Sequence, residues 1–414
     1  MGSFSTPLSG LTAAQQQLQA VSNNLANIDT DGYKDGTLTF SDMFSQAGNS
    51  NGSGDPVQVG SGVTVASMDS NFTDGTVSAT GTPSNMALSG NGFFVTKSST
   101  GVQEYTRAGD FTTNKMGQLV TPNGELVQGY PATNGVVNSS AALQALTVGN
   151  LTTPAVASTT VGVTANITSS TAVNDTATSS TPSIYDSLGT PHTLTVSYTK
   201  TAANTWTYAV TVPSADITGG TGTDTTVSTG TLNFDTSGAL LATSTIPPIS
   251  ISGLADGAAN ITLTGLFGTA TAPSITQNAS TSTTTSTSTD GLPSGTLSST
   301  DFTVDSDGTI EGKFSNGKTL ALGQVAVASF ANNQGLTSVG NNSYEPTNAS
   351  GSAVIGVAGS GGRGTITGGS VEASNVDIAT EFAKLIVAQQ AYSANAKSVT
   401  TFSTISQATL QMIQ

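Results

Sequence analysis

Apolar residues recur with a helical period at both ends of the chain. From Pro7 to about Ile28 they fall every seven residues in two neighbouring rows. The first row is Phe4, Leu11, Leu18 and Leu25, and the second is Ala14, Val21 and Ile28. Thr6 and Pro7 offer a hydroxyl cap and a proline suited to the first helical position. The spacing predicts a helix with a coiled-coil seam, whose other face carries uncharged Gln, Ser and Asn.

A longer helix is predicted at the C-terminal end, over roughly residues 375–413. Ser374, with Asp377 three residues later, is a weak form of the capping box. The apolar positions keep a 4-3 spacing and continue after a shift of three residues, a stammer. They are Phe382, Leu385, Gln389, Tyr392, Ala396 and Val399, then Phe402, Ile405, Thr409 and Met412. We expect the two terminal helices to lie together at one end of an elongated subunit.

The middle of the chain has the period of strands. Short runs rich in Thr and Val alternate between apolar and polar residues, as in 192–198 and 205–210, and Gly, Asn and Asp turns separate them. Residues 47–55 are rich in Gly, Asn and Ser, which predicts a flexible loop. Residues 278–290 are a low-complexity run of Ser and Thr. The fold class predicted is therefore mainly β with long α-helical termini.

The order of these patterns predicts nested domains. Residues 1–30 and 371–414 form the terminal helical domain, and 31–71 form a connecting segment. Residues 72–145 and 291–370 form an inner β domain, into which 146–290 is inserted as an outer β domain. The β pattern of 72–145 resumes at about 291, so the two ends of the insert should return to one place.

Composition narrows the classes of function. The 414 residues carry a net charge of -15 and only 8% charged residues. A chain this acidic is repelled by phosphate backbones and anionic lipid head groups, so neither nucleic-acid binding nor membrane insertion is expected. No run approaches 18 apolar residues. The first Lys is Lys34, and a basic region typical of a secretory signal is missing, so we expect export without a cleaved signal peptide.

Three motifs resemble sites that carry chemistry, and each has a simpler structural explanation. His192 is the only histidine, and no nucleophile-elbow sequence accompanies it, so a structural or surface role is favoured over a catalytic triad. One histidine and no cysteine argue against a zinc site. The sequence GSGGRG at 359–364 matches a dinucleotide fingerprint but opens no helix, which favours a hinge.

A partial calcium-loop pattern at 305–308 has Thr303 and Phe314 at the first and twelfth ligand positions, so a hairpin turn explains it better. The acidic residues are scattered, and no acid–base pair stands out. We therefore predict no enzyme activity, no catalytic or cofactor-binding residue and no metal ligand.

The terminal helices are the remaining candidate site. Burial of one apolar row offsets only part of the conformational entropy lost when a helix becomes ordered, so these helices need partners. They could form an antiparallel pair packed on the β domain, or become ordered only against copies of the chain. Uncharged faces favour the second arrangement, because burying them strands no charge. The predicted self-assembly seam is Phe4, Leu11, Leu18, Val21, Leu25, Ile28, Phe382, Leu385, Tyr392, Val399, Phe402, Ile405 and Met412.

Several motifs resemble the axial proteins of the bacterial flagellum, the rod and hook family. They are SNNLAN at 22–27 with DGYK at 31–34, NFTDG at 71–75, GNGFF at 90–94, EASNVD at 372–377 and VAQQAY at 387–392. They cover roughly 1–145 and 291–414. The hook branch fits better than the rod branch, because FSDMF at 40–44, QGYP at 128–131, IYDS at 184–187 and residues 328–335 are hook-like. Rod subunits also lack an insert such as 146–290.

The resemblance implies a structural subunit that polymerises into the hook, a curved tubular universal joint between rod and filament. The terminal helices would form the inner tube, with β domains radiating outward. The implied partners are copies of the chain, the rod, hook cap and hook–filament junction proteins, and the flagellar export apparatus. The implied location is the extracellular hook and basal body. A distal rod subunit, a secreted β-rich adhesin and a hydrolase using His192 are the alternatives. An adhesin would call for an aromatic site, yet Trp206 is the single Trp.

Overall fold

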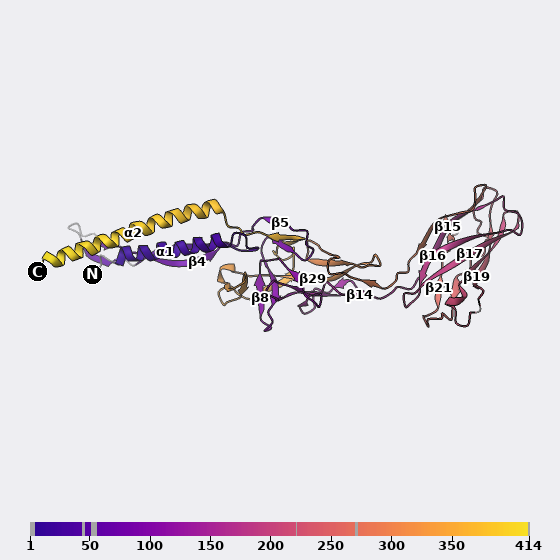
Figure 1. Ribbon diagram of the computed structural model, residues 1–414, viewed down its shortest axis with the longest axis horizontal. Helices are drawn as coiled ribbons and strands as arrows, with labels where there is room; N and C mark the ends of the chain where they lie inside the picture. Colours follow the sequence, from indigo (N-terminus) through magenta and orange to yellow (C-terminus); the bar gives the residue numbers. More distant parts are fainter. Residues whose placement is uncertain (1–4, 44–45, 51–55, 221, 270–271, 413–414) are drawn as a thin grey trace. The chain divides into compact units, whose positions relative to one another are not determined.

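The structure, a computed structural model, describes residues 5–43, 46–50, 56–220, 222–269 and 272–412. Over these residues the chain is mainly β, with one α-helix at each end (Figure 1). The predicted fold class is thus confirmed. The chain divides into two compact units. Unit 1 is Met1–Asn150, Ser298–Lys313 and Thr319–Gln414, and unit 2 is Leu151–Leu297 with Phe314–Lys318.

Helix α1 spans Ser5–Ala26. Its start differs from the prediction, because Thr6 and Pro7 lie within the helix rather than at its cap. Proline is tolerated there, since the N–H groups of the first turn have no acceptor inside the helix. Ile28 lies beyond the end of the helix, in a turn. Among the described residues, no helix is both long and apolar enough to cross a membrane.

Helix α2 spans Ile378–Met412 and begins later than predicted. Thr380 N donates to Asp377 Oδ1 at 2.7 Å, which makes Asp377 the N-cap. The predicted Ser374 cap is wrong, because the Ser374 hydroxyl accepts from Val376 N at 3.4 Å instead. The hydrogen bond from the Thr380 backbone is the main reason that the pKa of the Asp377 carboxyl is lowered.

Two short hairpins follow α1. Strand β1 (Gly36–Asp42) pairs antiparallel with β4 (Val63–Ser70), and β2 (Gln46–Ser50) pairs with β3 (Pro56–Val59). The prediction of a flexible loop over 47–55 is wrong for residues 47–50, which lie in β2, and residues 51–55 lie outside the described ones. The β1–β4 hairpin packs on α1 (Figure 1).

The remaining strands of unit 1 centre on one sheet of mostly antiparallel strands with the path β27-β28-β29-β11-β7-β8-β31-β30. Along β7, successive residues point to opposite faces, so Phe94 joins one buried cluster and Phe93 the other. The core of unit 1 therefore lies on both faces of this sheet. The strands of this sheet are β7 (Phe93–Lys97), β8 (Gln103–Thr106), β9 (Thr112–Thr113), β10 (Leu119–Val120), β11 (Leu126–Thr133), β12 (Val136–Val137), β13 (Gln144–Ala145), β27 (Phe302–Val304), β28 (Thr309–Lys313), β29 (Thr319–Ser329), β30 (Thr337–Gly340), β31 (Ser343–Glu345) and β32 (Val354–Val357), with a 3₁₀ turn η2 (Asn333–Gly335). Two separate antiparallel pairs are β6 (Met86–Ser89) with β33 (Thr365–Gly368) and β5 (Val77–Ala79) with β34 (Ser370–Glu372).

The predicted hairpin turn at 305–308 is confirmed, and the segment 359–364, for which a hinge was predicted, is a connection between two strands. Residues 359–364 connect β32 to β33 and open no helix. Residues 305–308 close the β27–β28 hairpin, where Gly308 has a φ of 84°, a left-handed conformation that glycine adopts without strain. Neither segment forms the binding loop that its sequence pattern resembles.

Unit 2 is a β domain with a single large apolar core. A four-stranded antiparallel sheet, β16-β17-β18-β19, and a three-stranded sheet, β24-β15-β25, supply most of it. Trp206 is fully buried there, and its Nε1 donates to Gln277 Oε1 at 2.8 Å. Much of the Ser/Thr run at 278–290 forms β25. The strands are β14 (Thr152–Thr153), β15 (Val161–Thr168), β16 (Thr176–Tyr185), β17 (Pro191–Ala202), β18 (Thr205–Val212), β19 (Thr225–Asn233), β20 (Ile249–Ile251), β21 (Ile261–Leu263), β22 (Gly268–Thr269), β23 (Ala272–Pro273), β24 (Ile275–Asn278), β25 (Thr283–Thr289) and β26 (Gly295–Thr296), with a 3₁₀ turn η1 (Ser214–Asp216).

Candidate assembly site on the terminal helices

The contact between α1 and α2 uses small and polar side chains. At one end of the pair, Asn24 Nδ2 donates to Glu381 Oε2 at 3.2 Å. At the other end, the Asn395 side chain packs against Gly10, where an added Cβ would lie 2.9 Å from it. Ala388, between these contacts on α2, is fully buried. Because residues near the end of α1 meet residues near the start of α2, the two helices are antiparallel.

Helix α1 is covered on two sides, by α2 and by the β1–β4 hairpin. Ser9 Oγ accepts from Val63 N at 3.2 Å, and Gly36 N donates to Asn24 Oδ1 at 2.9 Å. Of the predicted seam on this helix, Val21 is buried with 3% of its surface exposed. Leu11, Leu18 and Leu25, and Ile28 beyond the helix, are partly buried, and Phe4 lies outside the described residues.

Helix α2 is covered much less. Only Glu381 and Ala388 are buried among its 35 residues. Of the predicted seam, Leu385 and Val399 are partly buried. The others are exposed: Phe382 48%, Tyr392 38%, Phe402 36%, Ile405 56% and Met412 81%. The seam thus divides into an α1 half that its own chain largely covers and an α2 half that faces solvent.

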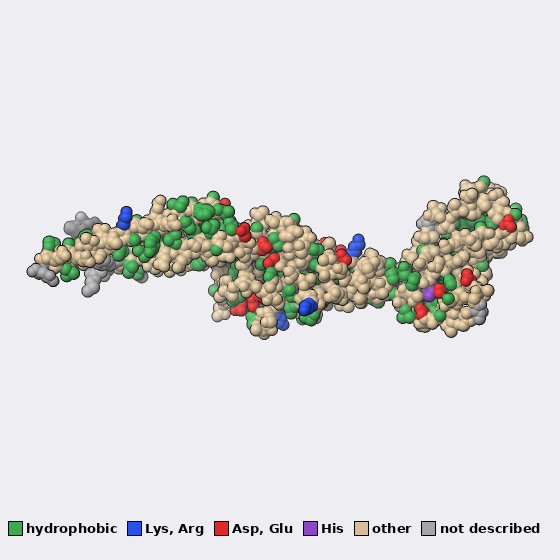
Figure 2. All heavy atoms as spheres, in the orientation of Figure 1, with side chains coloured by type: hydrophobic (Ala, Val, Ile, Leu, Met, Phe, Trp, Pro, Cys, Tyr) green, Lys and Arg blue, Asp and Glu red, His purple; other side chains and the backbone are tan. Residues whose placement is uncertain are grey.

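Sequence reasoning missed part of this exposed surface. Ile378 and Ile386 are each 52% exposed and flank Phe382 at intervals of four residues. Residues spaced by four share one helix face, so these three side chains form a stripe, called here the α2 stripe. Green apolar side chains gather along the helix pair in Figure 2. The spacing of four residues was visible in the sequence, but the 4-3 spacing used to predict the seam left out Ile378 and Ile386.

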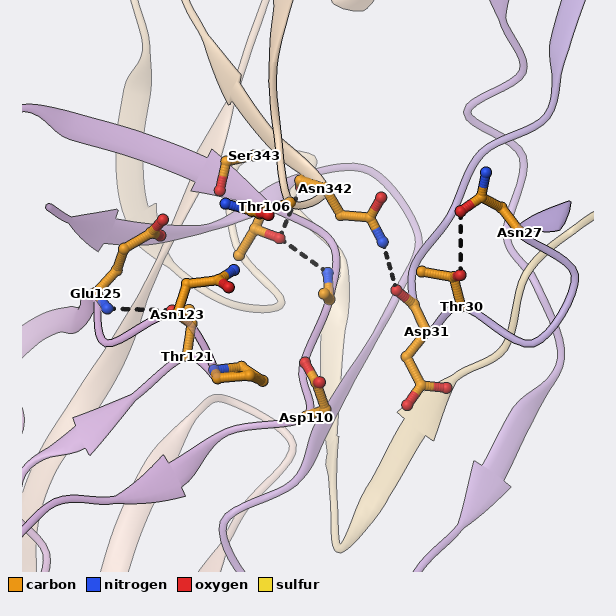
Figure 3. A pocket seen from close by; sticks show the side chains of 13 residues that line it. Asn27, Thr30, Asp31, Thr106, Asp110, Thr121, Asn123, Glu125, Asn342 and Ser343 are labelled. Atoms are coloured by element: carbon orange, nitrogen blue, oxygen red, sulfur yellow. Dashed lines mark hydrogen bonds between the residues drawn. The ribbon is translucent and has the colours of Figure 1, made fainter. Parts of the chain in front are cut away.

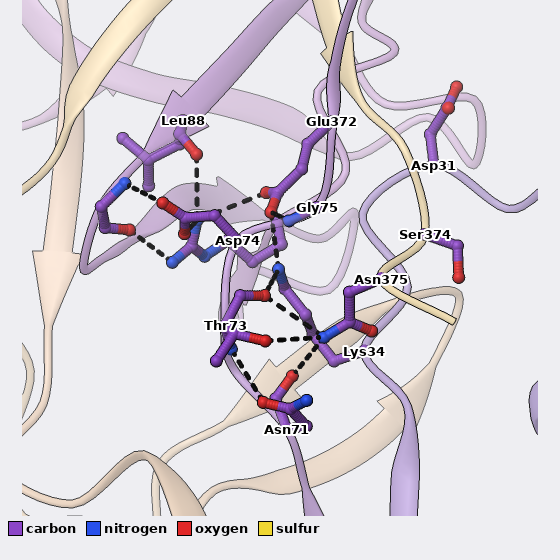
Figure 4. A network of polar contacts seen from close by, with 12 residues as sticks. Asp31, Lys34, Asn71, Thr73, Asp74, Gly75, Leu88, Glu372, Ser374 and Asn375 are labelled. Atoms are coloured by element: carbon purple, nitrogen blue, oxygen red, sulfur yellow. Dashed lines mark hydrogen bonds and ion pairs between the residues drawn. The ribbon is translucent and has the colours of Figure 1, made fainter. Parts of the chain in front are cut away.

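A buried polar network anchors the base of the helix pair to the β structure of unit 1 (Figure 4). Lys34 Nζ lies 2.6 Å from Glu372 Oε1, and both side chains are almost fully buried. Arg107 Nη1 lies 3.3 Å from Glu372 Oε2 and 3.5 Å from Asp74 Oδ1. Burial lowers the pKa of Lys34, while the bond to Glu372 opposes that shift. Two buried cations sharing one buried carboxylate hold these segments in a single arrangement.

Asparagines complete the anchor next to this network. Asn375 Oδ1 accepts from Asp35 N at 2.8 Å, and its Nδ2 donates to Asn71 O at 2.8 Å (Figure 4). Tyr33 Oη donates to Asn24 Oδ1 at 3.1 Å. The segments that meet here include the motifs at 22–27, 31–34, 71–75 and 372–377, which are far apart in the sequence. The motifs that carry the family resemblance therefore form the junction beneath the helix pair.

A polar pocket of about 380 Å³ opens in unit 1 (Figure 3). Three carboxylates, Asp31, Asp110 and Glu125, line it with Asn, Thr and Ser side chains, and no Lys, Arg, His or Cys is among the described lining residues. Burial raises the pKa of Asp31, helped by the charge of Asp110, and burial also raises the pKa of Asp110. The pocket thus gathers three carboxylates with amide and hydroxyl groups in one polar hollow.

His192 lies inside unit 2 and not on its surface, with 4% of its surface exposed. Its Nδ1 is 2.9 Å from Asp216 Oδ2, and its Nε2 is 3.2 Å from Asp186 Oδ2. A catalytic triad needs one ring nitrogen directed at a serine hydroxyl, whereas both nitrogens here face carboxylates. The geometry therefore fits a structural role for His192, which was one of the two roles expected from the sequence.

Four family models match the chain. The model described as "Flagella basal body rod protein" matches residues 4–34, and "Flagellar hook protein FlgE/F/G D1 domain" matches 87–171. "Flagellar basal body protein FlaE D2 domain" matches 150–292, and "Flagellar basal body rod FlgEFG protein C-terminal" matches 367–412. The rod-family models thus match the two ends of the chain, which contain α1 and α2.

Full-length relatives are similar as well. The flagellar hook protein FlgE of Salmonella typhimurium is 35% identical over 412 residues, covering 96% of this chain and 97% of its own. FlgE of Treponema pallidum is 32% identical over 461 residues, covering 98% of each chain. A crystal structure of the Helicobacter pylori hook protein FlgE2 is 17% identical and covers 70% of this chain and 98% of that chain with a TM-score of 0.44, a similarity too low to carry an argument.

Proposed function

This chain belongs to the flagellar hook protein family, and from that premise we propose that its copies polymerise into a hook, the curved tubular joint between rod and filament. Hook proteins match it from end to end, which favours a hook subunit over a distal rod subunit or a secreted adhesin. Its work is structural: it transmits torque by being part of a tube, and its relatives are structural proteins rather than enzymes.

One observation carries the proposal: a 35-residue helix that buries only two of its residues within its own chain. Because each large apolar side chain of the α2 stripe is about half exposed, complete cover by a neighbour would contribute roughly 0.8–1.5 kcal/mol, half of the value for a fully exposed side chain. Apolar stripes of this kind mark contact surfaces on soluble proteins. Identical contacts repeated head to tail, without ring closure, generate a helical polymer. The seam residues of α2, together with the stripe, are the surface we assign to this contact.

The domains take different roles in this proposal. Residues 1–30 and 371–414 form the tube wall, and 72–145 with 291–370 support it through the buried network around Glu372. Residues 146–290 form the outer domain, whose Thr-rich surface suits weak, hydrated contacts that exchange as the tube bends. Partners beyond the chain's own copies are the rod, the hook cap, the hook–filament junction proteins and the export apparatus that delivers the subunit outside the cell.

Polymerisation of the purified full-length chain tests this function. Concentrated protein, viewed by negative-stain electron microscopy, should form tubes. Ile386→Glu should abolish them while the circular dichroism of the monomer stays unchanged, because the Ile386 side chain is already exposed. Val136→Glu is the matched control, since Val136 is an exposed apolar residue of β12 outside the helices. Tubes that form normally with Ile386→Glu, or that are lost equally with Val136→Glu, contradict the assignment of α2 as the contact.

A further inference from the structure

Three ligand-bearing side chains converge in unit 2. Asp186, His192 and Asp256 each offer one ligand atom, and these atoms lie within 4.8 Å of one another. They come from the turn after β16, the start of β17 and the loop between β20 and β21. Asp186 and His192 are buried, whereas Asp256 is exposed. The cluster is therefore open to solvent on one side only.

The histidine ring is oriented by a residue outside this cluster. Asp216 Oδ2 lies 2.9 Å from His192 Nδ1. The contact at Nδ1 holds the ring in an orientation that directs Nε2 at Asp186. Histidines that bind metals typically donate their other ring nitrogen to a carboxylate in this way. The Asp216 contact thus orients the ring independently of Asp186, which faces Nε2.

Both carboxylates of the cluster are held in place by their own segments. Asp186 Oδ1 accepts from Leu188 N at 2.8 Å and Thr190 N at 2.9 Å, which leaves Oδ2 facing Nε2 of His192 at 3.2 Å. The Thr190 hydroxyl donates to Asp256 Oδ2 at 2.8 Å. Two ligands of a tetrahedral zinc ion, each about 2.1 Å from it, lie about 3.4 Å apart. The separation of Asp186 from His192 is close to that value.

The charge of the cluster also calls for a cation. Three carboxylates, those of Asp186, Asp216 and Asp256, surround one imidazole. In the part of the chain that the structure describes, no Lys or Arg forms an ion pair with any of them. A protonated ring would balance one of these charges, whereas a divalent ion bound to a neutral ring would balance two.

We propose that Asp186, His192 and Asp256 bind one divalent transition-metal ion, with zinc the best match to a nitrogen and two carboxylate oxygens. Water fills the remaining position on the side of Asp256. The bound ion clips the turn after β16, the start of β17 and the loop before β21 together, and so stabilises unit 2. This inference is independent of polymerisation. It departs from the sequence expectation of no zinc site, which counted histidines and cysteines but not carboxylates brought together by the fold.

Metal titration of the full-length chain tests the site. Protein stripped with a chelator is titrated with ZnCl₂ by calorimetry, and with CoCl₂ by visible absorption, which reports the coordination geometry. We expect one ion per chain. Asp256→Asn should weaken zinc binding at least tenfold without unfolding, because Asp256 is exposed. Asp216→Asn should weaken binding about 10- to 100-fold by releasing the ring. Asp224→Asn, at another exposed carboxylate of unit 2, is the control and should bind as the parent does.

Each outcome of the metal titration either supports the proposed site or overturns it. Stoichiometric binding that Asp256→Asn loses and Asp224→Asn keeps supports the site. No zinc or cobalt binding, or binding that Asp256→Asn retains in full, overturns it and leaves His192 as a proton-bearing link between Asp186 and Asp216. Equal weakening by Asp256→Asn and Asp224→Asn also overturns it, since only the general negative charge of the chain would then attract the ion.

Discussion

Unit 2 buries its large apolar side chains around Trp206, within a single chain, whereas helix α2 leaves Phe382, Ile405 and Met412 in solvent. Unit 2 is rich in Gly and Thr, which suits strands joined by tight turns, whereas α2 contains no Gly and several Ala, which suits a long helix. Unit 2 packs two sheets around one core, whereas in the part of the chain that the structure describes the main neighbour of α2 is α1. A region that closes its own core can fold by itself, whereas we propose that copies of the chain complete α2, which does not close one.

The largest expected effect comes from deleting one region at a time. Removing residues 378–412 should abolish tubes, because it removes the surface that we propose neighbours cover. Replacing residues 151–297 with a short Gly/Ser linker should still allow tubes with altered curvature. The linker is feasible because the ends of unit 2 lie together: Leu297 N donates to Leu151 O at 2.8 Å. Electron microscopy of both variants checks this. Tubes that form without α2, or tubes that fail to form without unit 2, would contradict the roles proposed for the two regions.

The junction beneath the helices should respond strongly to a single change. Glu372→Gln leaves Lys34 and Arg107 buried without their shared carboxylate. Removing one partner of a buried ion pair costs about 3–5 kcal/mol, and this loss should appear in the unfolding of unit 1. Urea unfolding followed by circular dichroism measures it. The exposed Asp301→Asn, which removes a charge from the surface of unit 1, should have little effect, and equal losses in both variants would argue against a special role for the junction.

A truncation in each region sharpens the contrast further. Leu194 is fully buried in unit 2, so Leu194→Ala should cost about 2–5 kcal/mol. Phe382 is 48% exposed, so Phe382→Ala should change the stability of the monomer by less than about 1 kcal/mol. Fluorescence of Trp206, the single Trp, reports the unfolding of unit 2, and circular dichroism reports the helices. A large monomer effect at Phe382 would mean that α2 is packed by its own chain.

Sequence patterns predicted the helices and strands well where apolar residues repeat regularly along one face of the element. The helices and strands were found because their periods of 3.6 and 2 extend over many residues. The antiparallel pairing of α1 with α2 was only the less favoured of the two arrangements weighed, because Gly10, Asn24 and Ala388 give no strong hydrophobic signal. The cap was misplaced because both Ser374 and Asp377 are good capping residues, and only hydrogen bonds distinguish them. The carboxylates around His192 come from separate segments, and no local pattern could have joined them.

Hydrogen exchange on the dilute monomer should rank the two regions by local stability. Residues 402–412 are all exposed at the far end of α2, so their amides should exchange first. The central strands β17 and β18, which are paired on both sides, should exchange last. Polymerisation should then slow exchange in α2 and leave β17 and β18 unchanged. Protection of 402–412 in the monomer equal to that of β18 would contradict the view that α2 is completed by neighbours.

The smallest expected effect lies in unit 2 and depends on pH. The Asp290 carboxylate accepts hydrogen bonds from the Thr159 hydroxyl and from the N–H groups of Thr159 and Thr160. Desolvation raises the pKa of Asp290, but these hydrogen bonds outweigh it and lower the pKa from 3.8 to about 2. Because the folded pKa lies below the unfolded one, the stabilisation is complete above pH 3.8 and is lost as the pH falls through about 2.

Asp290 is exposed, so solvent screening limits this contribution to less than about 1 kcal/mol. Asp290→Asn should therefore destabilise unit 2 slightly at pH 6, and the difference from the parent should shrink toward zero as the pH falls to 2. Urea unfolding followed by Trp206 fluorescence at several pH values measures that difference. The pH-dependent contributions of the carboxylates that both proteins share cancel in it. Asp224→Asn should show no such trend. A difference that stays constant from pH 6 to 2 would mean that the Asp290 carboxylate adds nothing to the closure of unit 2.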